Sequence, residues 1–356
     1  MDKRFVVKGV DAHTPLAEAA PALLRSKAKP LFDLEAAARG GADMDAVHDM
    51  RVASRRLREA MRLLEPLYPR KEFRAWYRNV RAITRALGPV RDSDVFIDAF
   101  SRLGTQLGEA GRRYVAFAVG YRMGQREHEL GVLNAVLGKL DLEESRRSFK
   151  ALVDSPSDSA VADRTLAEFA HAEVAVRAAT VFEAQPPALD EDNIASQHAL
   201  RIDYKRLRYA VEAFAPCYGD AFDDVHAVLT AFQDTLGDLH DLHVFLDMVR
   251  LPERTEAAVR AGVSAEGISH VASLLEAHAH ETFTDFAKLA AEHDPERLLA
   301  ALLLPLSQTQ GETHSVQPPE VADVRFVVGY VEETSGDPVA PDARETRGHR
   351  PRPERE

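Results

Sequence analysis

The sequence contains the same motif twice, about 150 residues apart. The first copy reads, at fixed spacing, His48, Arg51, Arg55, Arg56, Leu57, Arg58, Pro66 and Tyr68. The second copy keeps the spacing with His198, Arg201, Lys205, Arg206, Leu207, Arg208, Pro216 and Tyr218. A further shared stretch follows in each copy, Leu87–Phe96 and Leu236–Phe245. The duplication predicts that the chain folds as two related units of about 150 residues each.

The spacing of apolar residues predicts that both units are helical. Ala, Leu, Arg and Glu dominate, apolar residues recur three and four positions apart, and the alternation typical of strands is nearly absent before residue 320. Gly40–Gly41 precede a predicted helix that begins near Asp43 or Asp45, and Pro66 and Pro69 close it. Since each long helix carries one apolar stripe, which packing in a bundle would bury, each unit is expected to be a bundle of about four helices.

The chain of 356 residues is long enough for two units of ordinary domain size, and its hydrophobic content of 45% excludes general disorder. We expect an N-terminal extension over residues 1–14, bundles over about 15–150 and 160–304, and a linker at residues 155–159. Residues 305–356 are expected to form a mostly disordered, solubilising tail, with β-like character at 324–331. The last arginines of the tail could contact an anionic partner: Arg344, Arg347, Arg350, Arg352 and Arg355.

Composition excludes several classes of protein. The lone cysteine, Cys217, excludes a disulfide framework and a cysteine-based zinc site. The longest apolar stretch near the C-terminus, Leu298–Leu306, has nine residues, whereas a membrane span needs about 20. The first residues lack the apolar core of a signal peptide. We therefore expect a cytoplasmic protein that does not enter a membrane and needs no cofactor or metal.

Charge is distributed unevenly along the chain. The formal net charge is -12, yet residues 48–91 contain 12 Lys or Arg and 4 acidic residues, a net charge of +8. A basic block on an acidic protein concentrates a local positive field, while the remaining surface repels nucleic acid.

The basic residues of each copy fall on one side of a predicted helix. At about 100° per residue, one arc of about 80° contains His48, Arg51, Arg55, Arg58 and Arg62, and the opposite side contains Met50, Ala53, Leu57, Met61 and Leu64. The second copy places His198, Arg201, Lys205 and Arg208 in the same way. The next helix of the first copy adds Arg74, Arg78, Arg81 and Arg85. We call these rows the cationic ladders.

Such rows favour a ligand of opposite charge. Like charges three and four positions apart on a helix repel each other, and Asp49 and Glu59 are expected to lie off the ladder. The planar guanidinium suits paired hydrogen bonds to phosphate oxygens. Because the rungs repeat once per helical turn, about 5 Å, one long polyanion could meet successive rungs, and two bundles related by pseudo-symmetry could bring both ladders to one cleft. His would serve as a further donor.

These motifs, with the later Leu-Gly-x-x-Arg-Asp stretch, resemble the CHAD family, the conserved-histidine α-helical domain, over about residues 15–304. The resemblance implies an all-α fold, a tandem pseudo-symmetric pair of four-helix bundles around a basic central cleft or pore. It implies binding of inorganic polyphosphate, and location at polyphosphate granules in some members. Matching positions are His48, Arg51, Arg55, Arg56, Arg58, Arg91, His198, Arg201, Lys205, Arg206 and Arg208. Because His240 stands where Arg or an Asn-like residue is commoner in the family, and Asp203 lies inside the second ladder, we expect the second copy to bind more weakly and to depend more on pH.

Two other functions remain open from the sequence. His48-Asp49 and His240-Asp241, with His243, suit an HD-type metal-dependent phosphohydrolase acting on polyphosphate or nucleotides. However, a ladder of cations favours binding without cleavage, and we expect no catalytic residues. Asp92 and Asp241 are expected to anchor arginine side chains or the turns after Gly88 and Gly237. An RNA-binding module is the third possibility, disfavoured by the net charge and by the absence of aromatic residues between the rungs. The sequence leaves the oligomeric state open.

Overall fold

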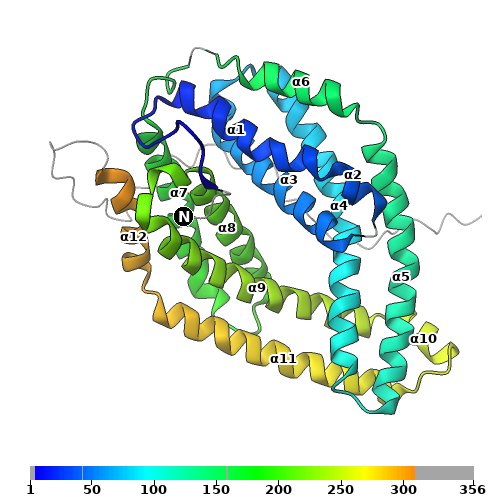
Figure 1. The fold of residues 1–356 in the computed structure, drawn as a ribbon. Coiled ribbons are helices and arrows are strands. Elements are labelled where there is room, and N and C mark those ends of the chain that lie inside the picture. The colour runs from blue at the N-terminus through cyan, green and yellow to red at the C-terminus, as the bar shows by residue number, and fades with distance from the viewer. Residues whose placement is uncertain (1–4, 42, 158, 309–356) are drawn as a thin grey trace, which may run out of the picture. The chain divides into compact units, whose positions relative to one another are not determined.

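The computed structural model describes residues 5–41, 43–157 and 159–308, which are largely helical (Figure 1). The first copy forms α1 (Leu16–Asp33), α2 (Glu35–Gly40), α3 (Met44–Leu64), α4 (Arg70–Gly104), α5 (Glu109–Leu137) and α6 (Leu142–Val153). The second forms α7 (Leu166–Ala188), α8 (Ile194–Ala213), α9 (Phe222–Arg250), α10 (Pro252–Arg260), α11 (Ala265–Glu292) and α12 (Pro295–Gln308). The all-α prediction is confirmed for these residues. The expectations for the tail beyond residue 308 lie outside them.

The helix that carries the first motif begins and ends as predicted. Asp43 caps α3 because its side chain accepts a hydrogen bond from the Ala46 N–H at 3.0 Å. At the other end a 3-10 turn, η2 (Glu65–Leu67), contains Pro66, and α4 begins directly after Pro69. The second copy repeats this turn as η3 (Ala215–Cys217), with Pro216 inside it. Proline lacks the N–H that would continue the helical hydrogen bonds, and so both motifs end alike.

The turns expected after Gly88 and Gly237 are wrong. Gly88 and Pro89 lie inside α4, which runs unbroken over 35 residues, and Gly237 lies inside α9. Leu87 and Val90 are fully buried on either side of the glycine and proline. Within a helix a glycine costs about 1 kcal/mol and a proline about 3 kcal/mol relative to alanine. Full burial of the two aliphatic side chains contributes about 3–6 kcal/mol, so packing can outweigh the local preference for a turn.

The two copies are joined by reciprocal backbone hydrogen bonds at the starts of α1 and α7. The Leu16 N–H donates to the Arg164 carbonyl at 2.8 Å, and the Leu166 N–H donates to the Thr14 carbonyl at 2.9 Å. Leu16 corresponds to Leu166 and Thr14 to Arg164, each 150 residues apart, so each copy donates one of the two bonds and accepts the other. These bonds flank an isolated antiparallel bridge.

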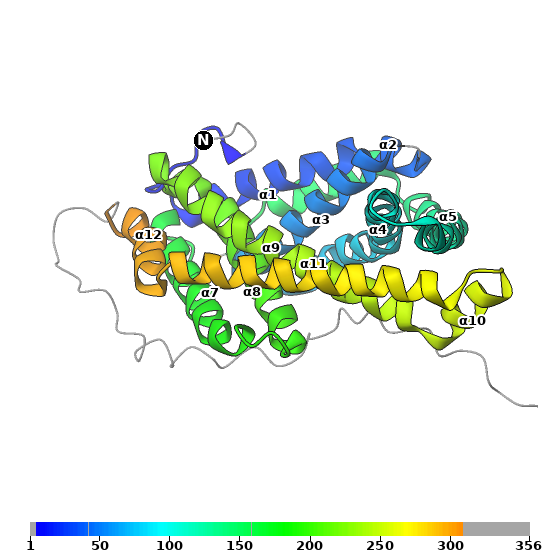
Figure 2. The same ribbon diagram turned by 90° about the horizontal axis from the view of Figure 1, so that it is seen from below.

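Buried side chains of both copies form a common core. One cluster contains Leu57 of α3 together with Leu207 of α8, and a smaller cluster joins Phe96 of α4 to Phe245 of α9 and Val271 of α11. Helices α10 and α12 lie at opposite ends of the described helices in both views (Figures 1 and 2). The repeats thus position their motif helices, α3 and α8, against each other. None of the described helices is long and apolar enough to cross a membrane.

Candidate functional site

The first ladder occupies the face of α3 opposite its buried residues. Met50 and Leu57 are at most 1% exposed. His48 is exposed, and the four arginines of the ladder on this helix are partly exposed: Arg51, Arg55, Arg58 and Arg62. The helical periodicity predicted this division into an apolar and a cationic face.

The Leu-Gly-x-x-Arg-Asp motif of α4 packs against this ladder. The Arg51 Nη2 donates a hydrogen bond to the Asp92 Oδ1 at 3.3 Å. The Arg51 guanidinium also lies over Gly88, where a Cβ atom would come within 2.7 Å of Nη1. Burial and the charge of Arg91 lower the pKa of His48. Of the two roles expected for Asp92, the structure thus shows the anchoring of an arginine.

The second copy places its equivalent residues in a related way. The Nδ1 atoms of His198 and His240 lie 3.1 Å apart, with ring centroids separated by 4.5 Å. Burial and the charge of Arg201 lower the pKa of His240 to about 3, and the same causes together with Lys205 lower the pKa of His198. Both rings are therefore neutral at neutral pH, and one Nδ1 donates to the other. His240 thus lies beside the ladder histidine of its copy, and its counterpart Arg91 acts electrostatically on the ladder histidine of the first copy.

The two copies meet in what we call the central cluster: Arg51, Arg55, Asp92, Arg201 and Asp241. Burial lowers the pKa of Arg201, which also interacts electrostatically with Asp241 of its own copy and with Arg55 and Asp92 of the other. Burial raises the pKa of Asp241 to about 6; Arg201 opposes this shift and Asp92 adds to it. The arginines of both ladders therefore interact electrostatically with one another and with the two carboxylates.

Several predicted binding residues have no acidic partner. The ones that form no ion pair with another described residue include Arg55, Arg78, Arg81, Arg85 and Arg91. Arg78 and Arg85 are exposed, and the other three are partly exposed. Arg58 instead lies over the ring of Tyr77, at 5.7 Å from its centroid, and its Nε atom is buried without a hydrogen-bond partner. The guanidinium groups of these residues on α3 and α4 are therefore in no direct ion pair with a carboxylate of the described residues.

Other predicted binding residues pair with carboxylates within the chain: Arg56 and Arg208 with Glu212, Arg62 with Glu59, Arg74 with Glu65, and Arg206 with Asp203. The shortest of these contacts join Arg56 to Glu212 and Arg74 to Glu65, both at 2.6 Å. Glu59 was expected off the ladder, yet it lies 3.5 Å from Arg62, because the long arginine side chain reaches across the helix surface to a residue three positions away.

Glu212 was not singled out from the sequence, although it organises a buried network. Its carboxylate, 1% exposed, accepts from Arg56 and lies 3.0 Å from the His226 Nε2, and its backbone carbonyl accepts from the Lys27 Nζ at 3.1 Å. Burial disfavours the ionised carboxylate, but the hydrogen bonds from His226 and Arg56 outweigh it and lower the pKa to about 2. The available signal was a departure from the repeat, because Glu212 stands where the first copy has Arg62.

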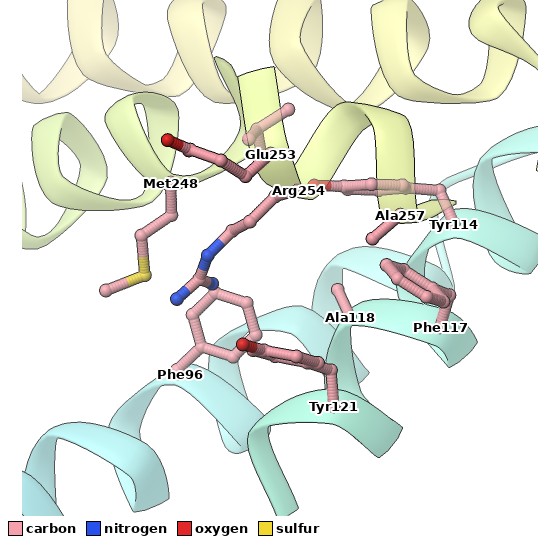
Figure 3. A pocket seen from close by; sticks show the side chains of 10 residues that line it. Phe96, Tyr114, Phe117, Ala118, Tyr121, Met248, Glu253, Arg254 and Ala257 are labelled. Carbon is pink, nitrogen blue, oxygen red and sulfur yellow. The ribbon is translucent and has the colours of Figure 1, made fainter. Parts of the chain in front are cut away.

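The described residues contain no group of three His, Cys, Asp or Glu side chains that could hold a metal ion. A separate pocket of about 80 Å³ lies between α4, α5, α9 and α10 (Figure 3). The Arg254 guanidinium lies over the ring of Tyr121 there, 5.3 Å from its centroid, and Phe96 forms part of the wall. None of the sequence-predicted binding residues lines this pocket.

Comparison with known proteins bears on the fold and on the family. Two solved structures have a similar fold. The CHAD domain from the plant Ricinus communis is 23% identical, with a TM-score of 0.58, over 85% of this chain and 96% of that chain. PptA from Streptomyces chartreusis is 17% identical, with a TM-score of 0.59, over 79% of this chain and all of that chain. At these identities the similarity concerns the fold. No curated protein matches the sequence.

Residues 22–250 match the CHAD domain family, a segment that contains both histidine-arginine motifs and the whole central cluster. The resemblance inferred from those motifs is therefore confirmed, and the chain belongs to the CHAD domain family.

Proposed function

We propose that the protein binds inorganic polyphosphate along the two cationic ladders and does not hydrolyse it. The observation that carries this proposal is the central cluster, in which arginines of both copies interact electrostatically with Asp92 and Asp241. Arg55 of this cluster, and Arg85 and Arg91 of α4, form no ion pair with other described residues. A chain of phosphates is a ligand that could pair with all of these cations at once, because it carries one negative charge per unit.

The strength of such binding comes from several charged hydrogen bonds acting together. Each one contributes about 1.5–3 kcal/mol. Displacement of counterions from a polyanion makes the affinity fall steeply with salt. The family resemblance extends the proposal to association with polyphosphate granules.

Binding without cleavage fits the residues around the cluster. Asp92 and Asp241 interact with arginines, and the neutral His198–His240 pair has Arg201 and Lys205 as its charged neighbours. Cations beside the phosphates stabilise the bound chain directly, whereas a metal-dependent hydrolase would hold its metal with several carboxylates or histidines.

The test is a calorimetric titration of long-chain polyphosphate at two salt concentrations. The binding variant replaces Arg55, Arg85 and Arg91 with Gln. The matched control replaces Arg102, Arg113 and Arg260, exposed arginines that pair one turn away on their own helices, with Gln. Both variants lose the same formal charge. We expect the binding variant to lose about 100-fold or more in affinity, and the control to change less than about threefold.

Equal losses in both variants would mean that general charge, and not the ladders, attracts the ligand. Circular dichroism verifies that helicity is kept. Release of phosphate in the presence of Mn²⁺ or Mg²⁺, lost in His240→Ala, would support a hydrolase instead. Displacement of polyphosphate by RNA at equal phosphate concentration would favour nucleic acid as the ligand.

A further inference from the structure

We infer that Gly88 is a positioning residue for the ligand site, because its missing side chain gives the Arg51 guanidinium its place in the central cluster. A Cβ atom at Gly88 would lie 2.7 Å from the Arg51 Nη1 and 3.8 Å from its Cζ. Carbon and nitrogen atoms that are not bonded keep about 3.5 Å apart. The inference rests on the proposed function, since it assigns a role within the same site.

The contacts of Arg51 show what the glycine makes possible. With the guanidinium against the backbone of α4, its Nη2 reaches the Asp92 Oδ1 at 3.3 Å, one turn further along the helix. The side chain of Arg51 is 16% exposed, so most of it is enclosed by the protein. In this position Arg51 also acts electrostatically on Asp241 of the other copy. Gly88 therefore contributes to the geometry through which one ladder approaches the other.

The equivalent glycine of the second copy provides a matched control. Gly237 occupies the same place in the repeat and also lies inside a long helix, yet an added Cβ would meet nothing within 4 Å. Both substitutions introduce alanine into a helix interior, where it is favoured over glycine. Their effects on helix propensity are thus alike, and the two variants differ in the collision with Arg51.

The nature of the colliding group determines what Gly88→Ala changes. The atom met is the far end of a flexible side chain and not backbone, so the guanidinium moves while α4 keeps its path. Moving it breaks the hydrogen bond to Asp92 and displaces one cation from the cluster. We therefore expect the variant to keep its fold and to bind the ligand with lower affinity.

The experiment measures polyphosphate affinity and melting temperature for wild type, G88A, G237A, R51A and the double variant G88A/R51A. We expect G88A to bind about tenfold more weakly than wild type, and G237A to bind within about twofold of it. In the R51A background, G88A should change the affinity less than about twofold, because the side chain that it displaces is already absent. A purely structural effect of alanine would persist in that background.

The outcomes separate this inference from the proposed function. If wild type does not bind polyphosphate, the proposed function fails. If wild type binds but G88A and G237A behave alike, or if the effect of G88A is unchanged without Arg51, the positioning role is wrong. If G88A does not fold, recovery of the fold in G88A/R51A supports the inference, and unfolding of both overturns it.

Discussion

Asp241 has a carboxyl group whose ionisation should control the site near neutral pH. Burial and the neighbouring charges of Asp92 and Asp238 raise its pKa, Arg201 and Arg51 oppose them, and the result is a pKa of about 6. Above that value the carboxylate is negative and repels an anionic chain; below it the group is neutral and the net positive charge of the cluster grows.

We therefore expect polyphosphate affinity to rise as pH falls from 7 to 5, in the range where Asp241 takes up its proton. His240, with a pKa of about 3, stays neutral over this range in the unliganded protein. Titration calorimetry of wild type and Asp241→Asn at pH 7, 6 and 5 measures the effect. The variant should show a weaker dependence, and a wild-type affinity that falls with acidification would contradict the assignment. This also tests the expected pH dependence of the second copy.

A second prediction concerns the contribution of Glu212 to the free energy of unfolding. Because hydrogen bonds lower its pKa from 4.5 to about 2, its contribution to stability is present above pH 4.5 and is lost as the pH falls from 4.5 to 2. Glu212→Gln leaves Arg56 partly buried beside a neutral group. We expect the free energy of unfolding to fall by about 3 kcal/mol at pH 7.

Urea unfolding at pH 7 and pH 3 tests this expectation. The difference in the free energy of unfolding between wild type and variant should narrow at the lower pH, because the carboxyl group of the unfolded wild-type chain is then protonated. Equal stability at pH 7 would show that the ion pair with Arg56 makes no net contribution.

At the scale of helices, the contact between α5 and α11 depends on Gly267. A Cβ there would lie 2.4 Å from the Ala110 carbonyl oxygen and 2.8 Å from its carbon, so the collision is with backbone. Gly267→Ala should therefore separate the two helix starts and reduce the free energy of unfolding by about 1–3 kcal/mol. Gly131→Ala, in the exposed interior of α5 with nothing within 4 Å, should instead add up to about 1 kcal/mol. Chemical denaturation measures the free energy of unfolding of both variants. If both are destabilised, the cause is the substitution by alanine and not the collision with Ala110.

Helix boundaries at this scale were largely predictable, since caps and prolines act on their own neighbours. Asp43 caps α3 and Pro66 ends it, as expected. The expected turn after Gly88 was wrong because packing around Leu87 and Val90 keeps α4 continuous. Local signals thus failed where burial from distant elements outweighed them.

For the whole molecule, joining the ladders at the central cluster predicts a dependence on ligand length. A short polyphosphate that reaches a single copy forms the contacts of that copy alone. A longer polyphosphate that spans both copies forms the second set of contacts without a second association step. Polyphosphates long enough to reach both copies should bind at least about tenfold more tightly, per molecule, than polyphosphates that are too short to do so. Beyond that length we expect the affinity to level off. Titrations with polyphosphates of graded length, at equal total phosphate, measure this. An affinity per chain that grows only in proportion to the number of phosphates, with no steeper rise before the plateau, would indicate two separate sites.

Periodicity in the amino-acid sequence was sufficient to predict the helices and the cationic face of α3, because each depends on residues within a few turns of one another. The repeated motif was visible from direct comparison of two stretches of the sequence. Pairing between helices was beyond such patterns. Arg56 matches the binding motif as well as Arg55 does, yet Arg56 meets Glu212, 156 residues away in sequence, whereas Arg55 has no carboxylate partner among the described residues. The packing of α3, α4, α8 and α9 decides which cations remain available to a ligand, since opposite charges neutralise each other only where folding brings them within a few ångströms. The same packing places the Arg51 guanidinium over Gly88, where a side chain would collide with it.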